Sequence, residues 1–347
     1  VDLARGAKIL VVDGVDVVNE VDPDTINAGL FPDNAGEVHS FTVRDLDGTE
    51  RSFSMTSAVI TSTPVQNVKT INTGSGKAGY LLFNDHIATA EGKLFDAIIQ
   101  LDAEGITDLI LDIRYNGGGF LDISSQLAYM IAGAGRTSGE IFEAIMFNDK
   151  HPEFNPITGS RLEPVPFYSR SQGFDPDLDQ GTLLPSLDLG KVYVLTGSGT
   201  CSASESIING LRGVGVEVIQ VGSTTCGKPY GFFPASNCGT TYFTIQFQGV
   251  NAKGFGDYPD GFSPANTIED IGVTIPGCSV EDDFSADLGD PAEGRLAVAL
   301  NHIDTGTCPA PAGLFGPKLL NSSSIFTDNV LIQKSLWQHN RILKAIL

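Results

Sequence analysis

One strand-to-helix stretch indicates the fold: DLILDIRYNGGGFLDISSQLAYMI, residues 108–131. Its first six residues form a mostly apolar run that is typical of a buried strand. Three glycines at 117–119 predict a tight corner, because glycine adopts backbone conformations that other residues avoid. A helix is expected from about residue 121 to residue 131. The stretch therefore predicts a strand, a corner and a helix in succession.

Further strands and helices alternate on both sides of this stretch. Strands are expected at 79–83, 191–195 and 216–221, and helices at about 88–101 and 203–212. In the first of these helices, Leu94, Ile98 and Leu101 recur at helical spacing. This order predicts an α/β core with parallel strands.

The chain divides into three expected regions. Residues 1–64 are β-rich, with a polar loop at 22–37 and strands at 8–12, 40–44 and 51–55. Residues 65–308 hold the α/β core and include a long loop, rich in Pro and Asp, at about 149–188. Residues 309–347 are expected to form a Pro/Gly-rich linker and a short helical tail at about 329–346.

The charge balance argues against several classes of partner. Acidic residues outnumber basic ones 42 to 21, which gives a formal net charge of −21. Binding to phosphates needs clustered Lys and Arg, so nucleic acid and anionic membrane surfaces are not expected partners. No window approaches the roughly 18 apolar residues of a membrane span. No signal peptide is visible, so the localisation has to be inferred indirectly.

The five cysteines suggest a disulfide framework. Cys226 and Cys238 could bridge the base of a hairpin, and Cys278 and Cys308 could tie down the end of the chain, which leaves Cys201 free. Two such bridges suit an oxidising compartment, so a periplasmic or extracellular location is expected. Five reduced cysteines are the alternative. Zinc-site spacings are absent, so no structural metal and no cofactor are expected.

A second glycine-rich corner, GSGTCS at 197–202, places a serine at the start of a helix. In α/β sheets, ligands gather beyond the carboxyl ends of the strands, which is where both corners are expected. The Ser202 hydroxyl would be exposed there, and the helix N-terminus would stabilise developing negative charge. The alternative is a helix N-cap, in which Ser202 and Glu205 form a capping box.

Lys228 is expected near the same edge of the sheet. Roughly 11 helical residues carry the chain about 16 Å from the corner, and the following strand brings it back about 20 Å. A lysine acts as a base only when it is neutral, so its pKa must fall by several units, as burial can cause. Gly, Pro, Tyr and Phe flank Lys228 and are compatible with desolvation. An ordinary exposed lysine is the alternative.

The glycine corner at 116–119 matches neither a phosphate-binding loop nor a dinucleotide fingerprint. Its glycines would let a substrate approach the backbone closely. Their N–H groups, with that of Ala203, could form the oxyanion hole that acyl transfer requires. A plain tight turn is the alternative.

Three motifs in order, LDIRYNGGG at 111–119, SASE at 202–205 and GK at 227–228, resemble the C-terminal processing (tail-specific) serine protease family. The resemblance implies a crotonase-like core of mixed β-sheet and helices. It also implies Ser202 as nucleophile and Lys228 as general base, with the oxyanion hole at Gly118 or Gly119 and Ala203.

The resemblance extends to both sides of these motifs. Residues 3–14 look like the second half of a PDZ domain, so 1–64 are expected to be a partial PDZ-like domain. The segments at 258–264 and about 293–302 look like the closing part of the family's core. The peptide-binding half of the PDZ-like module, and any lipid anchor, would precede residue 1.

Two positions depart from the family pattern. Many members have a Gln four residues after the Lys, where this chain has Phe232, so another group would have to orient Lys228. Some members have an Asp about eleven residues after the nucleophile, where this chain has Gly213.

Other catalytic arrangements remain open at this point. His86 could pair with Ser202 in a different protease mechanism, and Cys201 could attack in place of its neighbour, although a disulfide or a buried site suits it better. The whole chain could be a catalytically inactive peptide-binding scaffold of the same fold, or a crotonase-like acyl-CoA enzyme. The presence of both Ser202 and Lys228 argues against the inactive scaffold, and the acyl-CoA enzyme explains neither the spacing of these two residues nor the PDZ-like start. The hypothesis is therefore a serine endopeptidase that acts on protein or peptide substrates through an acyl-enzyme.

Overall fold

The computed structural model describes residues 3–233, 235–238, 240–242, 244–310 and 341–342. Within this part the chain forms two compact units. The first unit holds residues 3–62 with 283–287, and the second holds residues 63–282 with 288–310 and 341–342.

The first unit is a four-stranded antiparallel sheet with one helix. The strands run in the order β2-β1-β3-β4, and their bounds are β1 Lys8–Val12, β2 Val15–Asp16, β3 Val38–Arg44 and β4 Glu50–Thr56. The polar segment 22–37 was expected to be a loop, and this is wrong for its first half, which forms α1 (Pro23–Leu30). The Asp22 side chain caps that helix by accepting from the Asp24 N–H, and Ile26 is buried. A cap and a buried apolar residue therefore accompany a helix in a segment whose composition resembles a loop.

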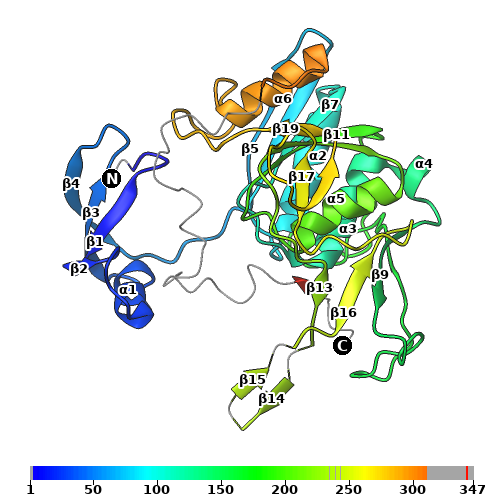
Figure 1. The fold of residues 1–347 in the computed structure, drawn as a ribbon, viewed down its shortest axis with the longest axis horizontal. Coiled ribbons are helices and arrows are strands. Elements are labelled where there is room, and N and C mark those ends of the chain that lie inside the picture. Colours follow the sequence, from blue (N-terminus) through cyan, green and yellow to red (C-terminus); the bar gives the residue numbers. More distant parts are fainter. Residues whose placement is uncertain (1–2, 234, 239, 243, 311–340, 343–347) are drawn as a thin grey trace. The chain divides into compact units, whose positions relative to one another are not determined.

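The second unit is built on a six-stranded sheet in the order β19-β12-β11-β7-β6-β5 (Figure 1). All neighbouring strands run parallel except β5 and β6, which are antiparallel. The bounds are β5 Val65–Asn72, β6 Lys77–Phe83, β7 Asp108–Asp112, β11 Lys191–Thr196, β12 Glu217–Gly222 and β19 Gly277–Ser279. The expected α/β core is confirmed, as a mixed sheet.

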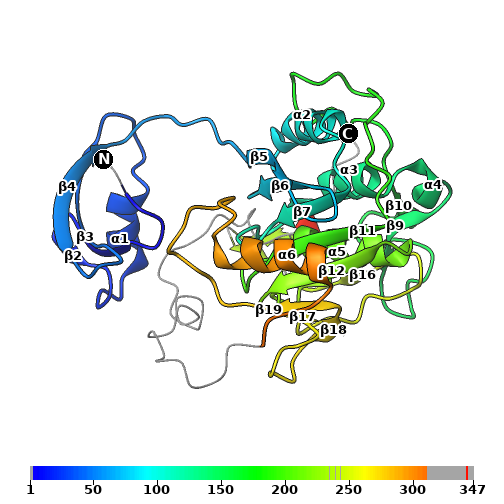
Figure 2. The same ribbon diagram turned by 90° about the horizontal axis from the view of Figure 1, so that it is seen from above.

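Helices cover both faces of this sheet (Figure 1, Figure 2). Side chains alternate along a strand, so Leu109 and Leu111 of β7 join one core while Ile110 joins the other. The first core holds residues of α2 (Ala90–Ala103), α3 (Leu121–Ala132) and α5 (Ala203–Gly213), and the second holds residues of α6 (Gly294–Thr305). Continuous apolar strand sequences therefore reflect burial on both faces.

Smaller elements lie around this sheet. An antiparallel sheet has the order β10-β9-β16-β13, and the long loop expected at 149–188 contains its edge strand β10. The remaining bounds are α4 Ala134–Thr137, β9 Ile141–Met146, β10 Val165–Pro166, β13 Tyr230–Gly231, β14 Ala235–Asn237, β15 Thr240–Tyr242, β16 Phe247–Val250, β17 Phe262–Pro264 and β18 Val273–Ile275.

One short strand comes from the far end of the sequence. β20 (Arg341–Ile342) pairs in parallel with β8 (Gly119–Phe120), with Arg341 opposite Gly119. The helical tail expected at 329–346 lies outside the described residues except for these two, and there the prediction of a helix is wrong.

A buried ion cluster joins the central sheet to α6. Arg114 is fully buried, and its Nε donates to Asp112 Oδ1 at 3.0 Å while Nη2 donates to Glu293 Oε2 at 2.9 Å. Glu293 also caps α6 by accepting from the Leu296 N–H at 3.0 Å. Buried charges persist only when they are paired, so the end of β7 and the start of α6 are held together.

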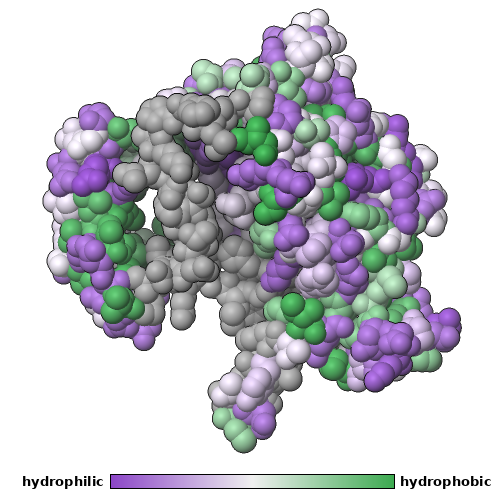
Figure 3. Space-filling model, viewed as in Figure 1, coloured by the Kyte–Doolittle hydropathy of each residue, from purple (hydrophilic) through white to green (hydrophobic). Residues whose placement is uncertain are grey.

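On the face shown in Figure 3, hydrophobic residues of the second unit lie in small groups among hydrophilic ones. Among the described residues, no helix has the length and apolar character needed to cross a membrane.

Candidate active site

Ser202 occupies a strained corner between β11 and α5. Its backbone has φ 58° and ψ −115°, a conformation that residues with a side chain rarely adopt and that costs about 1–3 kcal/mol. The residue is fully buried, and its hydroxyl has no hydrogen-bond partner among the described residues. Buried polar atoms are nearly always paired, so this hydroxyl and its strained backbone make Ser202 a candidate functional residue.

The capping alternative for Ser202 holds only in part. Its N–H donates to Glu205 Oε2 at 2.9 Å, which is one half of a capping box. The other half would use the hydroxyl, which stays unpaired within the described chain. The serine side chain is therefore left available for chemistry.

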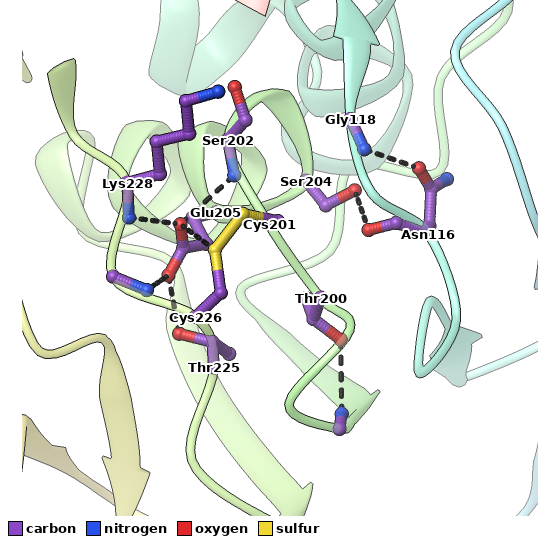
Figure 4. Close-up of a disulfide and its surroundings, with 12 residues drawn as sticks. Asn116, Gly118, Thr200, Cys201, Ser202, Ser204, Glu205, Thr225, Cys226 and Lys228 are labelled. Carbon is purple, nitrogen blue, oxygen red and sulfur yellow. Dashed lines mark hydrogen bonds between the residues drawn. A yellow bond between two sulfur atoms is a disulfide. The ribbon is translucent and has the colours of Figure 1, made fainter. Parts of the chain in front are cut away.

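The structure brings the loop of Lys228 to this corner. The Lys228 N–H donates to Glu205 Oε2 at 2.8 Å, the same oxygen that accepts from Ser202 at 2.9 Å. The two backbone nitrogens therefore lie no farther apart than the sum of these lengths. In Figure 4 the Lys228 side chain extends so that its amine and the Ser202 hydroxyl are drawn next to each other. The proximity expected from helix and strand lengths is found.

The position four residues after Lys228 is occupied by an aromatic ring. Lys228 Nζ lies 5.6 Å from the centre of the Phe232 ring, within the range of a cation–π contact. The Phe232 ring therefore contacts the lysine at the position where the family pattern has a Gln side chain.

Glu205 is the buried centre of this arrangement. Its Oε2 accepts from the Ser202 and Lys228 N–H groups, and its Oε1 accepts from Thr225 Oγ1 at 2.6 Å and the Gly227 N–H at 2.8 Å. Burial raises the pKa of the Glu205 carboxyl, and these donors, Thr225 foremost, act in the opposite direction. The carboxylate therefore joins the two loops.

A disulfide links the same two loops. Cys201, just before Ser202, is bonded to Cys226, two residues before Lys228, with their Cα atoms 5.2 Å apart (Figure 4). The predicted Cys226–Cys238 bridge is therefore wrong, because β12 returns Cys226 to the corner at the end of β11. Cys238 is an exposed free thiol. A sulfur held in this disulfide cannot act as a nucleophile.

The second predicted bridge is confirmed. Cys278 and Cys308 form a disulfide that joins β19 to the segment after α6. Two groups of possible metal ligands occur in the described chain, Cys278/His302/Cys308 and Cys201/Glu205/Cys226. Both include a disulfide, and metal-bound cysteine is a thiolate, so neither set suits a metal in this state.

The glycine corner packs directly against Ser202. Gly118 has φ 101°, and a Cβ built there would lie 2.9 Å from Ser202 Cβ and 2.9 Å from the Ala203 nitrogen. The Gly118 N–H already donates to Asn116 Oδ1 at 3.0 Å. Of the two glycines predicted for the oxyanion hole, Gly118 is therefore engaged elsewhere in this structure.

Gly119 presents its backbone to a different edge. His86 donates its N–H to Gly118 O at 3.3 Å, and Phe120 donates its N–H to His86 O at 3.0 Å. Successive residues of a strand point to opposite edges, so the Gly119 N–H faces away from His86, toward the edge where Arg341 pairs. Ala203 is the first residue of α5. Within the described residues, its N–H donates no hydrogen bond.

The two corners are fastened to each other through Asn116. Its carbonyl accepts from the Cys201 N–H at 3.1 Å and from Ser204 Oγ at 3.0 Å. Thr200 Oγ1 donates to the carbonyl of Ile113 at 2.8 Å. The glycine corner and the Ser202 corner therefore form one rigid edge of the sheet.

His86 is buried beside the glycine corner in a neutral form. Asn116 Nδ2 donates to Phe83 O at 3.0 Å, so Asn116 Oδ1 accepts, and His86 Nδ1 at 2.9 Å carries a proton. Burial lowers the pKa of His86 to about 3. Its Nε2 has no hydrogen-bond partner among the described residues, and a histidine this weakly basic is poorly suited to take a proton near neutral pH.

Sequence reasoning missed two residues that organise the site. Glu205 was recognised only as a helix cap, although its place in the SASE motif was a usable signal. Asn116 was recognised only as part of a turn, and nothing local shows that its side chain would pair with both Gly118 and His86.

Comparison with known proteins places the core in a family. Residues 77–232 match the model of peptidase family S41. A search of curated proteins found no match. A putative S41 protease from Bacteroides fragilis has 23% sequence identity and a TM-score of 0.60, covering 87% of this chain and 73% of its own. The photosystem II D1 C-terminal processing protease has 19% identity and a TM-score of 0.47, covering 78% and 63%.

The family match begins at residue 77, so it does not reach the region 1–64, and the PDZ-like interpretation of that region stays a prediction. The S41 structure from Bacteroides fragilis shares the fold of this chain. The motifs at 111–119, 202–205 and 227–228 all lie within the matched residues. Residues 77–232 therefore have the sequence pattern of peptidase family S41, and the chain is a serine-type peptidase.

Proposed function

We propose that this peptidase cleaves peptide bonds with Ser202 as nucleophile and Lys228 as general base. The observation that carries the proposal is the buried, unpartnered Ser202 hydroxyl at a strained corner, beside which Figure 4 draws the Lys228 amine. A serine hydroxyl attacks only when a nearby base accepts its proton.

The reaction proceeds in two halves. Neutral Lys228 accepts the proton of the Ser202 hydroxyl as Oγ attacks the scissile carbonyl carbon, and the resulting ammonium donates that proton to the leaving amine. Water then attacks the acyl-enzyme, Lys228 accepts its proton, and Ser202 leaves with a proton returned by the lysine. The net change is one water added across one peptide bond.

The oxyanion is held by backbone amides. The Ala203 N–H stands at the start of α5, where the helix dipole favours negative charge. Gly118 or Gly119 supplies the second N–H donor; in this structure the Gly118 N–H donates to Asn116 Oδ1 and the Gly119 N–H faces the edge where Arg341 pairs, so either group has to exchange that position for the oxyanion. Each such donor contributes about 10²- to 10³-fold to the rate.

Extended peptides are the substrates that fit this edge. β8 already accepts a parallel strand from Arg341–Ile342, which supports binding of substrate backbone by β-strand addition. The resemblance to tail-specific proteases suggests substrates cleaved near their carboxyl ends. The two disulfides support a periplasmic or extracellular site of action.

The test combines covalent labelling with turnover. A fluorophosphonate should label Ser202, identified by peptide mapping, and Ser202→Ala and Lys228→Ala should each lower hydrolysis of an unfolded protein by several orders of magnitude, as expected when members of one catalytic unit are lost. Circular dichroism checks that both variants fold. Near-normal turnover in either folded variant contradicts the serine–lysine assignment.

A further inference from the structure

We propose that Glu205 is the positioning residue that aims Lys228 at Ser202. The inference rests on the proposed function, because it concerns the geometry of the same catalytic pair. Glu205 touches neither substrate nor reacting atoms in this scheme and acts through the backbone of the two residues that do.

The hydrogen bonds of Glu205 are divided evenly between its oxygens. Oε2 accepts from the amides of Ser202 and Lys228, and Oε1 accepts from the Gly227 amide and the Thr225 hydroxyl. One carboxylate therefore fixes the nucleophile and three residues of the lysine loop. Displacing either oxygen would release a backbone nitrogen of the lysine loop.

The backbone of Lys228 is the starting point of a flexible four-carbon side chain, so the positions that Nζ can reach depend on where that backbone is held. The Glu205 carboxylate supplies that constraint, and it does so from a fully buried site where hydrogen bonds to a charged group are strong.

The donor set makes glutamine an unsuitable replacement. All three backbone groups on Glu205 are N–H donors, and only the Thr225 hydroxyl can turn to accept. In either orientation the amide NH₂ of a glutamine would face at least one backbone N–H. Glu205→Gln should therefore disrupt the loops although it preserves shape.

The decisive measurement separates kcat from KM. Glu205→Gln is expected to lower kcat by about 100-fold or more, in the range of general base catalysis, with KM within about threefold of wild type, because positioning acts on the chemical step. Glu205→Ala is expected to be similarly impaired and to regain activity with formate, which restores a carboxylate in the cavity, but not with chloride. A folded Glu205→Gln variant with kcat near wild type overturns the proposal, as does an equal response to formate and chloride.

Glu91 provides a matched control. It is a buried carboxylate on α2 whose oxygens accept from the backbone N–H groups of Gln172, Phe174 and Asp175. Glu91→Gln should lose stability comparably but retain kcat. An equal loss of kcat in this variant would show that the Glu205 effect is general destabilisation and would overturn the positioning role.

A second readout does not depend on catalysis. Amide hydrogen exchange should show that the Gly227 and Lys228 amides lose protection in Glu205→Gln while the amides of the β7 strand do not. If the wild type neither hydrolyses protein nor reacts with a fluorophosphonate, the proposed function fails, yet this exchange pattern would still establish the clamp. Unchanged protection at Gly227 and Lys228 would refute the clamp even in an active enzyme.

Discussion

Cys201 and Cys226 form a disulfide that joins the residue before Ser202 to the loop that ends in Lys228. Cys226 is exposed whereas Cys201 is buried, so a dithiol reductant reaches the bridge from the Cys226 side. Reduction is expected to lower kcat by about 10- to 100-fold, since small misplacements of catalytic groups have effects of this size. The measurement is peptidase activity against reductant concentration, with the free thiols of each cysteine counted by mass spectrometry.

The second disulfide supplies the control for this experiment. A Cys201→Ala/Cys226→Ala variant should reproduce the loss of kcat, whereas Cys278→Ala/Cys308→Ala should lose only stability, by about 3 kcal/mol for a loop of this length. If the two double variants have the same kcat, the Cys201–Cys226 bridge does not act on the catalytic pair.

The pH dependence of the rate distinguishes a lysine base from a histidine base. With Lys228 as base, kcat/KM should rise with pH along a limb whose midpoint lies well below 10 but above neutrality. His86→Gln should leave that limb in place. A limb that begins only above pH 10 would contradict a tuned lysine, and a limb that disappears in His86→Gln would assign the base to the histidine.

His86 should also make the protein sensitive to acid. Burial lowers the pKa of His86 to about 3, so the folded protein keeps it neutral while the unfolded chain binds a proton below about pH 6.5. The free energy of unfolding should therefore fall as the pH drops from about 6.5 to 3, with this group contributing up to about 1.4 kcal/mol per pH unit. Urea titrations at pH 7, 5.5 and 4 should show a shallower decline in His86→Gln than in wild type.

The glycine corner should tolerate no side chain at Gly118. Its backbone has φ 101°, and an added Cβ would meet Ser202 Cβ and the Ala203 nitrogen at 2.9 Å. Gly118→Ala is expected to lower kcat by about 100-fold by moving the nucleophile. Gly139→Ala carries similar backbone strain, at φ 79°, but its Cβ would meet no atom within 4 Å. Equal activities for the two variants would show that close contact at Gly118 is unimportant.

The buried ion cluster should matter for stability. Glu293→Gln removes one charge from Arg114, which is fully buried and also pairs with Asp112. Breaking a buried pair by removing one partner costs about 3–5 kcal/mol, because a charge is left uncompensated. Denaturant titrations should show this loss as a lower free energy of unfolding. If the free energy of unfolding falls by less than about 1 kcal/mol, Asp112 and Asp282 neutralise the Arg114 charge without Glu293.

The parallel core was predictable because its signals are local. Apolar runs such as 108–113, glycine corners and helical spacing all act over a few residues, and the structure has strands and helices close to each expected place. The segment 22–37 was misread because its order depends on the burial of Ile26 and on a cap at Asp22, which composition does not show.

The pairings within the site were less predictable because they depend on long-range geometry. Helix and strand lengths indicated that Lys228 returns toward Ser202, but they could not indicate that Cys226 reaches Cys201 rather than Cys238. The roles of Glu205 and Asn116 depend on which donors the fold brings to them. The sequence shows that these residues are present, but their roles can be recognised only when the positions of the surrounding loops are known.

The crossover from β11 through α5 to β12 separates Ser202 from Lys228 in the chain. Neither residue meets the other until β12 has aligned beside β11 in parallel register. Loop closure must precede such non-local pairing, which makes it a slow step of folding. A nascent chain therefore assembles the proposed catalytic pair only when this βαβ unit is complete.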